Sequence, residues 1–239
     1  PLPETMKRAT TDKDRFVGDP AFVDVPVERL LSASHAAGHA ASIAAGERAS
    51  VERLTYESPD TTHVVAIDRD GNAASMTHSL GMPSGVITDG LGFMYNGCMA
   101  VFDPRPGHAD SLAPGKSRFS SICPTMVFDG DDLQLALGAP GGTQIAMGVT
   151  QAILNVLDHD MGMLAAVSAP RVSGTSDAID VANGVPWSVT DALADEGYEI
   201  IRSPHTHDFA MVHGIRVDGD RLDGGADPAG DGTVQTVEP

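Results

Sequence analysis

The sequence has few cysteines and few lysines, and it lacks any apolar run long enough to cross a bilayer. Cys98 and Cys123 are too few and too far apart to suggest a zinc knuckle, and they give no reason to expect a disulfide. Only three lysines stand in a chain of formal net charge −18, so nucleic acid and anionic membranes are not expected as partners. No signal-peptide pattern opens the sequence, and the compartment stays open, with the cytoplasm slightly favoured.

At 239 residues the chain is long enough to bury the core of one ordinary domain. An alanine-rich stretch, 26–47, carries apolar residues at helical spacing and predicts a helix, and 48–60 predicts an exposed linker. The periodicity then changes to that of a hairpin, 62–68 and 72–80, which turns at Asp70-Gly71-Asn72. The rest indicates a layered α+β domain, with strands at 92–99, 123–129, 132–138, 198–202 and 209–217, helices at 142–158, 162–168 and 186–196, and a loose tail at 218–239.

The triplet Thr61-Thr62-His63 follows a polar segment, 57–60, and opens the first strand of this hairpin. A threonine hydroxyl is a poor nucleophile near neutral pH, and a free α-amine on the same residue is one way to activate it. Such an amine exists only if the bond between Asp60 and Thr61 is cut. Two threonines at the head of a strand usually reflect β-propensity alone, so the triplet needs support from the rest of the chain.

That support comes from segments 68–73, 119–125 and 138–143, with 17–20 before them and 169–171 after them. In this order the segments resemble the γ-glutamyltranspeptidase family over nearly the whole chain. The resemblance implies the four-layer αββα sandwich of N-terminal nucleophile hydrolases, without a cofactor or a metal. It also implies that 1–60 match only the end of a large subunit, that 61–239 match the small subunit, and that the two pieces of one precursor stay associated as a heterodimer.

The resemblance assigns the catalytic residues. Thr61 is the expected nucleophile, and Ser79 falls where the family places a hydroxyl, more usually that of a threonine, that hydrogen-bonds it. Gly141 and Gly142 are candidates for the oxyanion hole, because glycine allows close backbone approach and the following helix adds a positive N-terminal dipole. In isolation Pro-Gly-Gly would be read as a strand-to-helix turn.

The substrate-binding positions depart from the family. Ser120 and Ser121 match a serine pair that holds the α-carboxylate of a γ-glutamyl group, as short hydroxyls can. The positions that hold the α-ammonium in γ-glutamyl enzymes align with Gly81, Cys98 and Val101, none of which can pair with a cation. The sequence therefore favours a small-molecule amide whose acyl group keeps a carboxylate but lacks the α-amine, such as a dicarboxylic monoamide.

Three further features carry weaker expectations. The segment 102–120 is shorter than in relatives with a lid over the site, and its prolines and glycines predict a compact loop. His205 and His207 lack further ligands at metal-binding spacing, so no metal is expected there. His63 is expected to be structural rather than a base, on the ground that neighbouring residues of a strand point to opposite faces.

Two alternatives to an autoprocessed amidohydrolase remain. The first is a true γ-glutamyltransferase or glutathione hydrolase with a redesigned amine pocket. The second is a non-catalytic relative whose fold serves only assembly, although retention of Thr61, Ser79, Gly141 and Gly142 argues against it.

Overall fold

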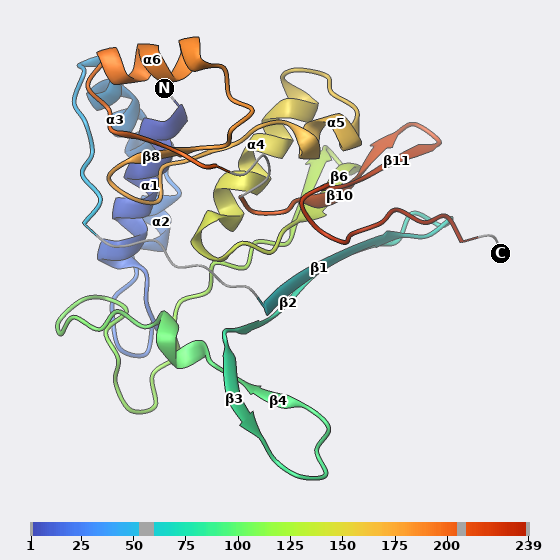
Figure 1. The fold of residues 1–239 in the computed structure, drawn as a ribbon, viewed down its shortest axis with the longest axis horizontal. Coiled ribbons are helices and arrows are strands. Elements are labelled where there is room, and N and C mark those ends of the chain that lie inside the picture. Colours follow the sequence, from blue (N-terminus) through green and yellow to red (C-terminus); the bar gives the residue numbers. More distant parts are fainter. Residues whose placement is uncertain (1, 53–59, 205–208, 238–239) are drawn as a thin grey trace.

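A computed structural model describes residues 2–52, 60–204 and 209–237. Its centre is an antiparallel four-stranded sheet with strands in the order β11-β10-β6-β5. Two helices cover one face of this sheet, and a β-hairpin lies against the other (Figure 1). The elements are β5 Thr125–Asp129, β6 Asp132–Gly138, β10 His213–Asp218, β11 Arg221–Ala226, helices α4 Ile145–Leu157 and α5 Met163–Ser168, and hairpin strands β1 Asp60–Ile67 and β2 Ala73–Gly81.

The main core lies between the four-stranded sheet and its two helices. Apolar residues recur along α4 at helical spacing and point toward alternate residues of β6. Helix α5 approaches β11 closely, since a side-chain carbon on Gly225 would lie 2.7 Å from the backbone of Met163. The buried residues of this core are Leu135, Leu137, Ala139, Ile145, Val149, Ala152, Val156, Met163, Ala166, Val167, Ala210 and Val212.

The hairpin confirms the predicted strands at 62–68 and 72–80 and their turn. Residues pair in register from Thr61 with Ser79 to Ile67 with Ala73. Asp68 closes the turn, because its Oδ1 accepts hydrogen bonds from the backbone N–H groups of Asp70 and Asn72, each at 2.9 Å. Alternation along the strands leaves an outer face that exposes apolar side chains, with Val64 51% and Met76 57% accessible.

A second, smaller sheet supports the N-terminal part of the chain. It contains β7 Val172–Ser173, β8 Ile179–Val181 and β9 Ile200–Arg202, and helix α6, Trp187–Asp195, packs beside it. Helix α1, Leu2–Phe16, lies against this sheet, where Lys7 Nζ donates to the carbonyl of Asp177 at 2.5 Å and Thr10 Oγ1 to that of Gly174 at 3.3 Å. Helix α1 and the strands β7 and β8 are not among the elements expected from the sequence.

The remaining predicted elements hold in part. The helix expected at 26–47 is two helices, α2 Val27–Leu30 and α3 Ala33–Ala44. The break falls at Ser32, which caps the start of α3, because its side chain accepts a hydrogen bond from the N–H of His35 at 3.1 Å. The strand expected at 92–99 is only β4, Met94–Asn96, which pairs with β3, Pro83–Ile87, before a 3-10 turn, Cys98–Val101.

The expectation of a loose tail at 218–239 is wrong for the first part of that tail. Strand β11 lies there and pairs with β10 along its whole length. Of the expected linker at 48–60, residues 53–59 lie outside the part of the chain that the structure describes. The α+β class is confirmed, with layers in the order helix, sheet, hairpin. Among the described helices none combines the length and the apolar character needed to span a membrane.

Candidate active site

Thr61 lies near the start of β1 on the face that looks toward the four-stranded sheet. It is directly opposite Ser79 in the pairing register, and the two side-chain oxygens are 2.8 Å apart. Ser79 Oγ also accepts a hydrogen bond from the N–H of Gly81 at 2.9 Å. Thr62, by alternation, faces outward and is exposed. The structure thus brings together the predicted nucleophile and its predicted hydroxyl partner.

The predicted cleavage bond coincides with an irregularity of the hairpin. Pairing shifts register between Asp60 and Thr61, so that Asp60 faces Gly81 while Thr61 faces Ser79. Extra residues of this kind bend a strand and occur often beside active sites. The Oδ2 atom of Asp60 is buried and has no hydrogen-bond partner among the described residues. Burying a carboxylate oxygen without a hydrogen-bond donor destabilises the folded chain, and this oxygen belongs to the residue just before the predicted cleavage bond.

A narrow hollow adjoins Thr61 and collects most of the predicted site. Its volume is about 10 Å³, close to the space that one water molecule needs. This hollow is too small for an acyl group, but Thr61 also lines a second hollow of about 480 Å³, on the side of Pro140 and Met211. The residues that line the narrow hollow are Thr61, Ser79, Gly81, Val101, Arg118, Ser121, Ile122 and Ile145.

The glycine turn before α4 borders the same place. Gly141 and Gly142 have φ angles of +138° and +58°, in the region that L side chains rarely adopt. A side-chain carbon on Gly141 would lie 2.6 Å from Cα of Ala210, so the chain is too close there for any other residue. A 3-10 turn, Gly142–Gln144, then leads into α4. Pro140 and Ile145, which flank the turn, line hollows that Thr61 also lines.

The corner formed by Gly81, Cys98 and Val101 contains a positive charge, the guanidinium of Arg118. Cys98 Sγ is 3.4 Å from the carbonyl of Leu80, and a side-chain carbon on Gly81 would lie 3.0 Å from that sulfur. Arg118 Nη2 approaches Cys98 Sγ at 3.4 Å, while its Nη1 donates to the carbonyl of Phe119 at 2.8 Å. The buried Val101 closes the corner. Arg118 is not among the residues expected from the sequence, and its signal there is its position two residues before the serine pair.

The two serines of that pair do not share one environment. Ser121 lines the hollow with Thr61 and Arg118. Ser120 is exposed, and its Oγ accepts from the N–H of Ile122 at 3.3 Å. Of the predicted binding residues, the structure therefore brings Gly81, Val101 and Ser121 to the hollow, with Cys98 directly behind Gly81 and Ser120 outside.

His63 shares the inward face of β1 with Thr61, because it lies two residues further along the strand. The expectation that the two side chains point to opposite faces is therefore wrong. Its Nδ1 is 2.8 Å from Thr77 Oγ1, and its ring covers Gly138, where a side-chain carbon would lie only 2.3 Å away. Burial, and to a lesser extent the charge of His213, lowers the pKa of His63 to about 4. These contacts indicate a neutral, structural histidine.

This lowered pKa predicts a loss of stability in mild acid. Between about pH 6.5 and pH 4 the unfolded chain protonates His63 and the folded chain does not, so unfolding is favoured as the pH falls, by about 1.4 kcal/mol per pH unit. We expect His63→Gln, which keeps a polar group opposite Thr77, to show a shallower fall in urea midpoint between pH 7 and pH 4.5. Equal slopes for the variant and the wild type would contradict this assignment.

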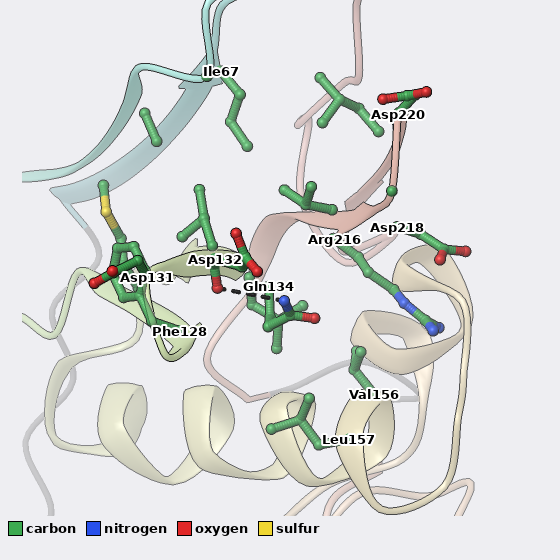
Figure 2. A pocket seen from close by; sticks show the side chains of 18 of the residues that line it. Ile67, Phe128, Asp131, Asp132, Gln134, Val156, Leu157, Arg216, Asp218 and Asp220 are labelled. Atoms are coloured by element: carbon green, nitrogen blue, oxygen red, sulfur yellow. Dashed lines mark hydrogen bonds between the residues drawn. The ribbon is translucent and has the colours of Figure 1, made fainter.

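A larger hollow than those at Thr61 lies elsewhere among the described residues and is not the candidate site. It measures about 1240 Å³ and lies between the turn end of the hairpin and the end of α4, with Ile67 on one side and Val156 and Leu157 on the other (Figure 2). Thr61 is six residues from Ile67 along β1, which corresponds to about 20 Å. Several acidic residues line this large cavity, and none of the predicted catalytic residues does.

The segment 102–120 is the compact loop that was predicted. Asp103 binds the guanidinium of Arg105 through both carboxylate oxygens, at 3.0 and 2.8 Å, and Asp110 Oδ1 accepts from the N–H of Phe119 at 3.0 Å. Lys116 Nζ donates to the carbonyls of Ala109 and Ser111. His205 and His207 lie outside the described residues.

Comparison with known proteins agrees with the resemblance read from the sequence. The sequence profile of the γ-glutamyltranspeptidase family matches residues 2–237. The acylase ACY 1 proenzyme of Pseudomonas sp. (strain V22) is 39% identical over 240 residues, which are 99% of this chain and 43% of that proenzyme. The cephalosporin acylase structure from Bacillus halodurans superposes with a TM-score of 0.85 at 28% identity, over 100% of this chain and 44% of that chain.

A structure of γ-glutamyltranspeptidase from Pseudomonas nitroreducens, complexed with L-DON, has a TM-score of 0.66 at 32% identity. It is covered in full by 74% of this chain. The chain thus spans less than half of the acylase proenzyme but the whole of a solved γ-glutamyltranspeptidase chain.

Proposed function

This chain belongs to the γ-glutamyltranspeptidase family, and from that premise we propose that it is the catalytic part of an amidohydrolase that cuts its own precursor before Thr61. The observation that carries the proposal is the 2.8 Å contact between Thr61 Oγ1 and Ser79 Oγ at the strand irregularity. The freed Thr61 then attacks amides whose acyl group bears a carboxylate.

The proposed reaction runs in two halves on Thr61. Its hydroxyl oxygen attacks the amide carbon, its own α-amine takes the hydroxyl proton, and the N–H groups at Gly141 and Gly142 stabilise the developing oxyanion. The C–N bond breaks, the leaving amine receives that proton, and an acyl ester on Thr61 remains. The α-amine then deprotonates a water molecule, which releases the acid and restores Thr61. Ser79 holds the Thr61 hydroxyl in position through both halves.

The proposal also divides the chain between two associated fragments. Residues 61–239 make up about three quarters of the chain, which is close to the share that covers the solved γ-glutamyltranspeptidase chain in full. Residues 1–60 would then end the large fragment, as the word proenzyme in the relative's name supports. The exposed apolar face at Val64 and Met76 and the large cavity near Ile67 are surfaces for the rest of that fragment to cover.

Arg118 supports the choice of acyl group. A guanidinium beside Cys98 repels an α-ammonium and attracts a carboxylate, and no ion pair occupies it among the described residues. Ser121 adds a hydroxyl on the same hollow. The name acylase in two of the compared proteins agrees with a substrate other than a γ-glutamyl amide. We therefore favour dicarboxylic monoamides over γ-glutamyl amides.

The test compares glutaryl-p-nitroanilide, γ-glutamyl-p-nitroanilide and the uncharged pentanoyl-p-nitroanilide on the processed full-length protein. The glutaryl compound should be hydrolysed fastest. Arg118→Met should lower its kcat/KM by about 10- to 100-fold, mainly through KM, because a charged hydrogen bond contributes about 1.5–3 kcal/mol. The pentanoyl compound should be affected little, since it has no carboxylate to bind.

Arg221→Met removes the same charge from an exposed position on β11 and should change neither rate. Fragment sizes on a denaturing gel show whether each variant is still processed. Faster hydrolysis of the γ-glutamyl compound than of the glutaryl one would support the alternative of a true γ-glutamyl enzyme. A processed protein that hydrolyses none of the three would contradict the proposed substrate class.

A further inference from the structure

A cluster of three metal-ligating side chains joins the first and third helices, well away from Thr61 in the sequence. Asp12 projects from α1, and His35 and His39 project from α3. Asp12 Oδ2 is 2.7 Å from His35 Nε2 and 2.8 Å from His39 Nε2, and the two Nε2 atoms are 3.1 Å apart. All three side chains are partly buried, with accessibilities between 20% and 30%.

Local structure sets this arrangement. His35 and His39 are four residues apart, so they lie on the same face of α3, one turn above the other. Their rings meet edge to face with centroids 4.5 Å apart. The Ser32 cap fixes the first turn of α3 and thereby the orientation of His35. Burial alone would raise the pKa of Asp12, but the hydrogen bonds and the charges of both histidines together lower that pKa.

With Asp12 as a carboxylate, hydrogen bonding alone cannot satisfy all three contacts of this triangle. Three close contacts join Asp12 Oδ2 and the two Nε2 atoms, and each Nε2 carries at most one proton. If both nitrogens donate to the carboxylate, no hydrogen bond joins the two nitrogens, and two N–H groups lie side by side with their nitrogens 3.1 Å apart. If only one Nε2 donates to the carboxylate, the other Nε2 presents its lone pair to the lone pairs of Asp12 Oδ2. A cation between the three atoms would satisfy all of them at once.

The spacing suits a transition-metal ion. Zinc binds imidazole nitrogen and carboxylate oxygen at about 2.0–2.2 Å. Each of the three separations is shorter than twice that bond length, so one ion can reach all three atoms. A tetrahedral ion with such bonds holds its ligands about 3.4 Å apart, so the three atoms would move apart by a few tenths of an ångström on binding. Two imidazoles and a carboxylate select borderline divalent metals over Mg²⁺ or Ca²⁺.

We propose that Asp12, His35 and His39 form a binding site for a divalent transition-metal ion, such as Zn²⁺, that fastens α3 to α1. None of the twelve residues of α3 is fully buried, so apolar packing holds this helix only weakly. Helix α1 is anchored to the small sheet through Lys7 and Thr10. The metal thus ties α3 to the body of the protein, independently of the chemistry at Thr61.

The test uses the full-length protein, freed of metal with EDTA and dialysed, and titrates it with Zn²⁺, Co²⁺ or Mg²⁺ by calorimetry. We expect one Zn²⁺ or Co²⁺ per chain, no response to Mg²⁺, and a thermal midpoint that rises by a few degrees with Zn²⁺. His39→Ala and Asp12→Ala should each weaken Zn²⁺ binding by about 100-fold or more and abolish that rise.

Two controls address other histidines. His159→Ala removes an exposed histidine beyond α4, and a double variant, His205→Ala with His207→Ala, removes the histidine pair outside the described residues. Both should bind as the wild type does. Absence of saturable Zn²⁺ and Co²⁺ binding by the wild type would overturn the proposal. Binding that is unchanged in His39→Ala and Asp12→Ala, or lost in the His205 and His207 variant, would overturn it as well.

Discussion

Replacing Thr61 with alanine is expected to leave the precursor uncut and to lower its amide hydrolysis by about 1000-fold or more. The variant lacks the only oxygen that can attack either the Asp60 carbonyl or the substrate in the proposed mechanism. It also keeps the α-amine of residue 61 within a peptide bond, so no base is released. Fragment sizes on a denaturing gel and the rate with glutaryl-p-nitroanilide measure the two effects separately.

Two variants control for this experiment. Thr61→Ser keeps a hydroxyl at the same place and should retain slow cleavage and measurable hydrolysis. Thr62→Ala changes the neighbouring threonine, whose side chain is exposed on the opposite face of β1, and should process normally. Cleavage and hydrolysis by Thr61→Ala at rates near those of the wild type would contradict the assignment of the nucleophile.

The largest expected loss of stability follows from separating Arg171 and Asp227. These side chains form an ion pair that is almost completely buried, with accessibilities of 6% and 0%. Arg171 Nη1 also donates to the carbonyl of Val167, and Asp227 Oδ1 accepts from the N–H of Ala229 at 2.8 Å. Removing one partner leaves an uncompensated charge inside the protein, so Arg171→Met should lower the free energy of unfolding by about 3–5 kcal/mol.

Urea unfolding of the processed protein measures this loss. The double variant Arg171→Met with Asp227→Leu should recover part of it, because neither charge remains. Asp160→Asn breaks the exposed ion pair with Arg216 and should change stability by less than about 1 kcal/mol. A loss in Arg171→Met no larger than in Asp160→Asn would show that the buried pair contributes little.

Local sequence patterns sufficed for the hairpin and for α4. Alternation and the Asp68 turn define β1 and β2, and the glycine turn marks where α4 begins. The contact of Thr61 with Ser79 was predictable from the family resemblance, and the antiparallel register explains it. In these cases the deciding interactions are close in sequence or repeat along it.

Features that depend on distant contacts could not be predicted. Helix α1 has a weak apolar pattern, and its buried Glu4 is satisfied by Arg8, Ala49 and Tyr198, two of which are far along the chain. Arg118 reaches Cys98 only through the loop that precedes the serine pair. The expectation of no metal rested on the family resemblance and on the spacing around His205 and His207, whereas Asp12 joins two other histidines only once α1 and α3 pack together.

The most direct test of the account is the intact mass and N-terminal sequence of the fragments in purified full-length protein. We predict two associated fragments, the smaller of which begins Thr61-Thr62-His63. That result would place a free α-amine on the residue whose hydroxyl contacts Ser79. A single uncut chain after prolonged incubation, or a new N-terminus at any other residue, would contradict the claim that Thr61 is an N-terminal nucleophile.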